Sequence, residues 1–130
     1  MPSFLSPLAR QPDASCSLRN TRTGAELARH LEPAFDRETR NRGLLGRESL
    51  DAGSALVLAP CNSVHTWFMR FPIDLLFVTK DGIIKKVRRM VRPWRIALSW
   101  GVHSVIELPA GSVGDCRPGD TVEVIPNIES

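Results

Sequence analysis

An apolar run that ends in an Asp-Gly turn places the strongest constraint on how this chain can fold. Residues Ile73 to Thr79 are almost entirely apolar, and Asp81-Gly82 separates them from a second run, Ile83 to Val91. An Asp-Gly pair between two apolar runs is the strongest short-range signal for a β-hairpin. The second run is interrupted by Lys and Arg, which indicates that one of its faces meets water. The sequence therefore predicts an antiparallel sheet that contains this hairpin.

Other parts of the chain also have the pattern of short strands separated by turns. Strands are expected over Ser54–Ala59, Val105–Leu108 and Thr121–Ile125, each bounded by Gly, Pro or Asp residues. Residues Ser17–Leu31 alternate loosely around Thr23-Gly24, as the two arms of a hairpin would. The arm after the turn contains good helix formers, so a helix is the alternative there.

One short helix is expected over about Ala34–Arg42. Pro33 suits the first turn of a helix, acidic residues come early, basic residues come late, and Gly43 is a natural stop. Combined with the strands, this predicts a mainly β (α+β) protein. The expected architecture is a small closed barrel or sandwich of six to eight short strands with one short helix.

The length of 130 residues fits one domain, and 42% hydrophobic with 24% charged residues is typical of soluble globular proteins. We expect a disordered tail over residues 1–16, a globular domain over 17–126 and a short tail over 127–130. No apolar run reaches the roughly 20 residues of a membrane-spanning helix. The N-terminus lacks the pattern of a secretion signal, and three cysteines at long spacings favour reduced thiols, so we expect a cytoplasmic location.

Cys61 and His65 are the first candidates for chemistry. If the turn at Pro60–Ser63 brings them together, a thiolate and an imidazole could hold zinc or copper, with Met69 or Met90 as a soft ligand. Further ligands would have to come from scattered residues, among them His30, His103 and Cys116. The same pair could instead be a nucleophile and its base. The simplest interpretation is a buried thiol beside a hydrogen-bonded histidine, and we predict no cofactor.

Asp74 and Glu107 are carboxylates inside apolar, strand-like runs. A buried carboxylate must be neutral, hydrogen-bonded or paired with a cation, and Arg40, Arg47 and Arg70 are the expected partners. The functional interpretation is a pair of acid and base groups in a pocket. The alternative is that each carboxylate faces water or holds an arginine in place.

The aromatic cluster of Trp67, Phe68 and Phe71, with Met69 between them, is expected in the core. The alternative is that aromatic residues interleaved with Arg70, Arg92 and Arg95 stack on bases or sugars. A basic stretch from Lys85 to Arg95 could bind an anionic polymer, although a solvated sheet face is the favoured interpretation and a nucleic-acid partner is disfavoured. The sequence contains no glycine-rich phosphate loop, HExxH or GxSxG motif, so it offers no support for nucleotide hydrolases, zincins or serine hydrolases.

Three segments in this order form a larger pattern: Arg40–Arg47, His65–Gly82, and Val105–Gly111 followed by Gly119-Asp120. Together they resemble the DUF192 family, a domain of unknown function, over roughly Leu18 to Ile125. The chain departs from the family at Leu45, where methionine is usual, and at Arg70-Phe71. The positions that match the family pattern are Arg40, Gly43, Leu44, Arg47, Met69, Asp74, Asp81, Gly82, Glu107, Pro109, Gly111, Gly119 and Asp120.

The resemblance implies a small, mostly β domain whose members often carry secretion signals, and it implies no established activity. We therefore expect a structural module, or one that binds a small ligand or peptide in a groove near His65, Arg70, Asp74 and Glu107, with Arg40 and Arg47 also at the site. A metal protein or enzyme centred on Cys61 and His65 is the first alternative, so catalysis remains open. An anionic-polymer binder that uses Lys85–Arg95 is the second.

Overall fold

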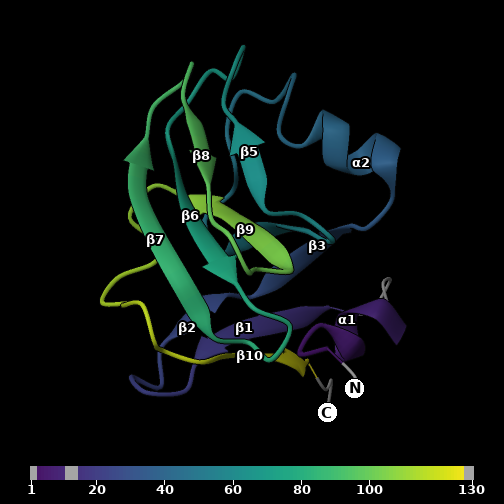
Figure 1. The fold of residues 1–130 in the computed structure, drawn as a ribbon, viewed down its shortest axis with the longest axis vertical. Coiled ribbons are helices and arrows are strands. Elements are labelled where there is room, and N and C mark those ends of the chain that lie inside the picture. The colour runs from purple at the N-terminus through teal and green to yellow at the C-terminus, as the bar shows by residue number, and fades with distance from the viewer. Residues whose placement is uncertain (1–2, 11–14, 128–130) are drawn as a thin grey trace.

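A computed structural model describes residues 3–10 and 15–127, which form ten β-strands and two short helices (Figure 1). The mainly β prediction is confirmed. The expected closed barrel is wrong, because the described strands form three open sheets of five, three and two strands. The strand and helix numbers also exceed the prediction of six to eight strands and one helix. No helix of the described residues is long and apolar enough to cross a membrane.

The five-stranded sheet has the order β3-β4-β9-β6-β7, and its two edges, β3 and β7, do not pair with each other. Its strands are β3 (His30–Ala34), β4 (Ser54–Leu58), β9 (Ser104–Pro109), β6 (Ile73–Val78) and β7 (Ile84–Val91). The pair β3 and β4 is parallel and the other neighbours are antiparallel. The predicted hairpin around Asp81-Gly82 is confirmed as β6 and β7.

The two smaller sheets use the remaining strands. The three-stranded sheet has the order β10-β1-β2 and consists of β10 (Val122–Pro126), β1 (Cys16–Asn20) and β2 (Glu26–Ala28). The pairing of β1 with β2 confirms the hairpin around Thr23-Gly24, and the helical alternative for its second arm is wrong. The two-stranded sheet pairs β5 (Ser63–His65) with β8 (Ile96–Leu98).

Both helices are short. Helix α2 (Arg37–Arg42) begins three residues later than predicted, because β3 continues to Ala34 and the Asp36 carboxylate caps the helix by accepting the Thr39 N–H at 2.7 Å. Helix α1 (Ser6–Arg10) corrects the expected disordered tail, since Leu8 is fully buried against the core. Residues 1–2, 11–14 and 128–130, where the tails were also expected, lie outside the described residues.

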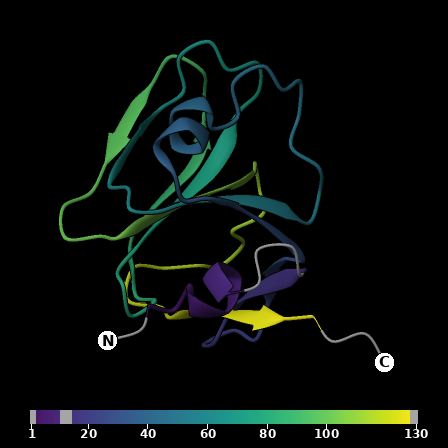
Figure 2. The same ribbon diagram turned by 90° about the vertical axis from the view of Figure 1, so that its right-hand side faces the viewer.

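The five-stranded sheet is covered on both faces (Figure 2). One face packs against the three-stranded sheet and α1, and the other packs against the β5–β8 pair, with α2 lying over it. Figure 2 shows α1 and β10 at the bottom and α2 at the top. Because side chains alternate along a strand, Ile106 and Leu108 of β9 join the first core, whereas Val105 joins the second. Glu107, two positions after Val105, therefore faces α2.

Gly82 ties the central hairpin to the neighbouring sheet. Its φ is +89°, and a Cβ at this position would lie 2.6 Å from the carbonyl oxygen of Val122. Gly82→Ala is therefore expected to cost about 2 kcal/mol in the free energy of unfolding, measured by urea titration. Gly46→Ala is the matched control, because Gly46 has φ +82° and no atom of the described residues lies within 4 Å of the added Cβ, so only the conformational cost of about 1 kcal/mol applies. Equal losses in the two variants would contradict a role for the close approach.

Candidate functional site

A cavity of about 290 Å³ lies between α2, β5 and the end of β9. It gathers four of the predicted site residues, namely Arg40, Cys61, His65 and Glu107. The other lining residues are Asn41, Arg42, Leu45, Leu58, Ser63, Val64 and Met69. We call this the Glu107 cavity.

Glu107 has an exceptional environment among the residues of this cavity. Only 3% of the residue is exposed, and its Oε1 atom has no hydrogen-bond partner among the described residues. Desolvation by burial raises the pKa of Glu107 to about 7, against a weaker opposing effect of the Arg47 charge. Gly43, just after α2, lies beside this oxygen, since a Cβ added there would be in ordinary van der Waals contact with Oε1 at 3.7 Å. The carboxyl group can therefore exchange a proton, or accept one hydrogen bond, near neutral pH.

The last turn of α2 supplies positive charge to the same cavity. Arg40 is anchored by a hydrogen bond of 2.8 Å from its Nη1 to the carbonyl oxygen of Phe35. Arg42 also lines the cavity and pairs with Glu38 at 3.3 Å on the exposed side of the helix. The expected ion pair between Arg40 and a buried carboxylate is wrong, because Arg40 bonds to backbone carbonyls.

Cys61 and His65 share the cavity, but they do not form a bonded pair. The Cys61 thiol donates to the carbonyl oxygen of Ser63 at 3.2 Å, and His65 lies against Trp67 with 4.8 Å between ring centroids. Burial raises the pKa of the Cys61 thiol, which keeps it neutral and poorly nucleophilic at neutral pH. Among the described residues, no three His, Cys, Asp or Glu side chains are placed to share a metal ion. This geometry gives no support to the nucleophile or metal alternative.

Asp74 lies outside the cavity and is fully buried in β6. Its Oδ1 accepts the backbone N–H of Met90 at 2.9 Å, and its Oδ2 accepts those of Gly111 and Val113 at 2.9 and 3.2 Å. Both the expected arginine partner and the expected position at a groove are therefore wrong. The backbone after β9 folds over the end of β6 and supplies the donors instead. Asp74 is a structural residue.

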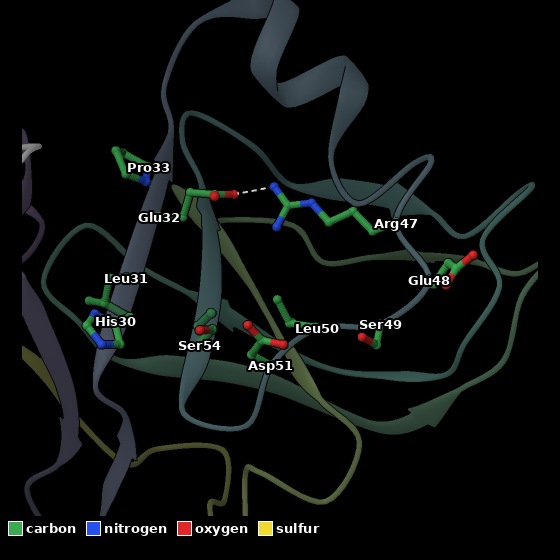
Figure 3. Close-up of a pocket in the computed structure, with 11 residues that line it drawn as sticks. His30, Leu31, Glu32, Pro33, Arg47, Glu48, Ser49, Leu50, Asp51 and Ser54 are labelled. Carbon is green, nitrogen blue, oxygen red and sulfur yellow. Dashed lines mark hydrogen bonds and ion pairs between the residues drawn. The ribbon is translucent and has the colours of Figure 1, made fainter.

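Arg47 and Arg70 also bind carboxylates other than the expected ones. Arg70 is largely exposed and lies 3.6 Å from Glu48. Arg47 reaches across from the loop after α2 to Glu32 on β3, and this ion pair borders a second, larger cavity of about 530 Å³ (Figure 3). Because Arg47 and Glu32 already satisfy each other there, we place the candidate site at the Glu107 cavity.

The basic stretch Lys85–Arg95 is partly used for structure. Lys86 donates to the carbonyl oxygen of Leu98 at 2.8 Å and lies over the Phe77 ring. Arg89 donates to the carbonyl oxygens of Gly114 and Cys116 at 3.1 and 2.7 Å. These two side chains hold neighbouring segments to the edge strand β7.

Asp120, one of the positions that match the family pattern, has a similar structural role. Hydrogen bonds from Arg22 and Asn20 hold its pKa well below the ordinary value, and it also accepts the backbone N–H of Arg117. The carboxylate thus fastens the β1–β2 hairpin to the turn before β10.

Sequence reasoning missed several cavity residues, chiefly Asn41, Arg42 and Ser63. They come from the end of α2 and from the start of β5, and only tertiary packing brings these segments together. Phe68 and Trp67 were expected in the core and are exposed instead, whereas Met69 is buried as expected. No local pattern distinguishes the exposed from the buried members of this cluster.

The family model described as DUF192, "Uncharacterized ACR", matches residues 18–124. A crystal structure of "a putative transcription regulator" from Sinorhizobium meliloti has a TM-score of 0.72 and 25% sequence identity, over 85% of this chain and 92% of that chain. A crystal structure of a protein of unknown function from Novosphingobium aromaticivorans has the same TM-score and 21% identity, over 84% of this chain and 83% of that chain. No curated protein matches this chain significantly.

Proposed function

The chain belongs to the DUF192 family, and from the Glu107 cavity we propose that it is a binding module for a small polar molecule. The observation that carries this proposal is a buried carboxyl oxygen, at the wall of a cavity, that has no hydrogen-bond partner in the part of the chain that the structure describes. An unsatisfied buried polar atom destabilises a protein, so its presence calls for a functional or structural reason. A ligand that donates a hydrogen bond to Glu107 would supply the missing partner.

The charges around the cavity define the class of ligand. Arg40 and Arg42 suit a carboxylate or another small anionic group, while Glu107 suits a hydroxyl or amine donor. A cavity of about 290 Å³ is at the lower end of ligand-site volumes. We therefore propose a zwitterion or hydroxy acid of about the size of an amino acid or short peptide end.

Thermal unfolding tests this proposal. It would be measured in the presence of amino acids, small hydroxy acids, and matched compounds that lack either the anionic group or the donor group. A ligand present at about 100 times its Kd stabilises the protein by about 2.7 kcal/mol, which raises Tm by several degrees. We expect this shift only for compounds that carry both groups. Glu107→Gln and Arg40→Gln are each expected to remove most of it.

Asp51→Asn serves as the control, because Asp51 lines the larger cavity and not the Glu107 cavity. This variant should retain the full ligand-induced shift. A hydrogen bond to the carboxylate form also lowers the pKa of Glu107, so binding near pH 7 should release protons, which calorimetry in buffers of different ionisation enthalpy detects. A ligand shift that persists in both cavity variants would contradict the proposed site.

A further inference from the structure

A group of large apolar side chains is exposed at one end of the molecule. Phe68 and Trp94 are 69% and 57% exposed, and Trp67 beside them is 42% exposed. Phe68 and Trp94 pack against each other with 4.6 Å between ring centroids. We call these three residues the aromatic tip. Their loops follow β5 and β7 and form the upper end of the long axis in Figure 1, opposite α1 and β10.

The backbone holds two of these side chains outward in an unfavourable conformation. Phe68 and Trp94 have φ values of +64° and +69°, a region that residues with large side chains rarely adopt. Such conformations persist only where the surrounding structure enforces them, and they gather at binding and switch regions. The exposure of the aromatic tip is therefore a built feature of the fold.

Thr66 enforces this arrangement. It is almost completely buried, its hydroxyl donates to the carbonyl oxygen of Arg92 at 2.6 Å, and it accepts the backbone N–H of Arg95 at 2.9 Å. The Thr66 carbonyl oxygen accepts the N–H groups of Met69 and Trp94 at 3.2 and 3.0 Å. One residue thus clamps both loops together, so little conformational freedom is left to lose when the tip binds.

The two segments of the chain that carry the aromatic tip contain basic residues and no acidic residue. The chain has no Asp or Glu from Ala52 to Ile73, and none from Gly82 to Ile106. Arg70, Arg92 and Arg95 belong to the two loops themselves, and Glu48 is the carboxylate that pairs with Arg70. An anionic surface would complement this combination of exposed aromatic rings and arginines.

We propose that the aromatic tip is a docking surface for an anionic lipid membrane. Trp and Phe side chains favour the region between lipid headgroups and acyl chains, and nearby Arg and Lys side chains bind anionic headgroups. The rings project from the end of the molecule, and none of them lines the Glu107 cavity or the larger cavity. A projecting apolar group suits insertion into a soft surface better than it suits the capture of a peptide in a groove.

Co-sedimentation with phosphatidylcholine vesicles, with and without phosphatidylglycerol, tests this proposal. We expect binding to the mixed vesicles and little binding to phosphatidylcholine alone. The double variant Phe68→Asn with Trp94→Asn should bind at least about tenfold more weakly. Asn tolerates a positive φ, so this variant should keep or raise its Tm, which separates lost binding from lost folding.

Two further experiments separate the contribution of the arginine charges from the insertion of the aromatic rings into the membrane. Arg92→Gln and Arg95→Gln should each weaken binding about fivefold at low salt, with smaller effects at high salt. In a variant that keeps only Trp94, with Trp67→Phe and Trp100→Phe, tryptophan emission should shift to the blue on addition of mixed vesicles. Trp100→Asn is the control, because Trp100 is 82% exposed but follows the far end of β8, and it should not change binding.

Each of four results would overturn the proposal. The first is no binding to mixed vesicles, and the second is unchanged binding by the double variant. The third is binding of a single-stranded oligonucleotide by the tip in place of vesicles, which would assign the aromatic rings to base stacking. Equal binding to neutral vesicles would contradict the requirement for anionic lipid.

Discussion

Asp74→Ala is expected to lower the free energy of unfolding by about 3–5 kcal/mol, the largest loss that we expect from a single side chain here. The Asp74 carboxylate accepts three backbone N–H groups, from Met90, Gly111 and Val113. Alanine would leave these donors without their partner at a position that is fully buried in the folded protein. For a domain of this size the loss corresponds to a fall in Tm of roughly 10 °C or more.

Urea unfolding of Asp74→Ala, Asp74→Asn and Asp51→Ala measures this effect. The asparagine variant keeps one oxygen acceptor and places an amide donor against the other N–H groups, so its loss should be intermediate. Asp51 is exposed, and its replacement should change stability by no more than about 0.5 kcal/mol. A loss of similar size in the Asp74 and Asp51 variants would contradict the structural role of Asp74.

Glu107→Gln, in contrast, is expected to raise the free energy of unfolding above neutral pH. Burial raises the pKa of Glu107 from its ordinary value of 4.5 to about 7, so the folded protein binds the proton more tightly than the unfolded chain does. The contribution of Glu107 to the free energy of unfolding should therefore be highest below pH 4.5 and fall as the pH rises to about 7. The total loss is roughly 3 kcal/mol and is complete above pH 7. Glutamine stays neutral and should remove this loss.

The difference in unfolding free energy between wild type and Glu107→Gln, measured from pH 4 to pH 8, tests directly whether the Glu107 carboxyl destabilises the protein as the pH rises. Other titrating groups are common to both proteins and cancel in the difference. Glu38→Gln is the control, because the Glu38 side chain is 85% exposed on α2 and should leave the pH profile unchanged. A wild type that matches or exceeds the stability of Glu107→Gln at pH 8 would contradict a desolvated carboxylate at this position.

The two carboxylates show how far the sequence alone leads. Asp74 and Glu107 have the same pattern, an acidic residue inside an apolar strand, and they received the same interpretation. In the structure, Asp74 is satisfied by three backbone donors, whereas Glu107 retains, beside a cavity, an oxygen without a partner among residues 3–10 and 15–127. The donors to Asp74 lie 16, 37 and 39 residues away along the chain. No local pattern specifies contacts of that separation.

The sequence by itself determined the features that depend on residues close together along the chain. The Asp81-Gly82 and Thr23-Gly24 hairpins, the apolar strands and the family pattern all follow from turn chemistry and alternation over a few residues. Helix α2 also follows from the stop at Gly43 and from the order of its charges, although β3 shortens its start. These features required no knowledge of how distant segments meet.

Tertiary structure alone decided that the three sheets stay open, which groups pair with the arginines, and which aromatic residues are exposed. Strand alternation tells which side chains share a face, but not which layer covers that face or which loop folds back over it. The clamp at Thr66, which turns Phe68 and Trp94 outward, joins segments 26 to 29 residues apart. Burial depends on the atoms that surround a residue in space. For this protein, both the candidate cavity and the exposed tip are products of contacts between distant parts of the chain.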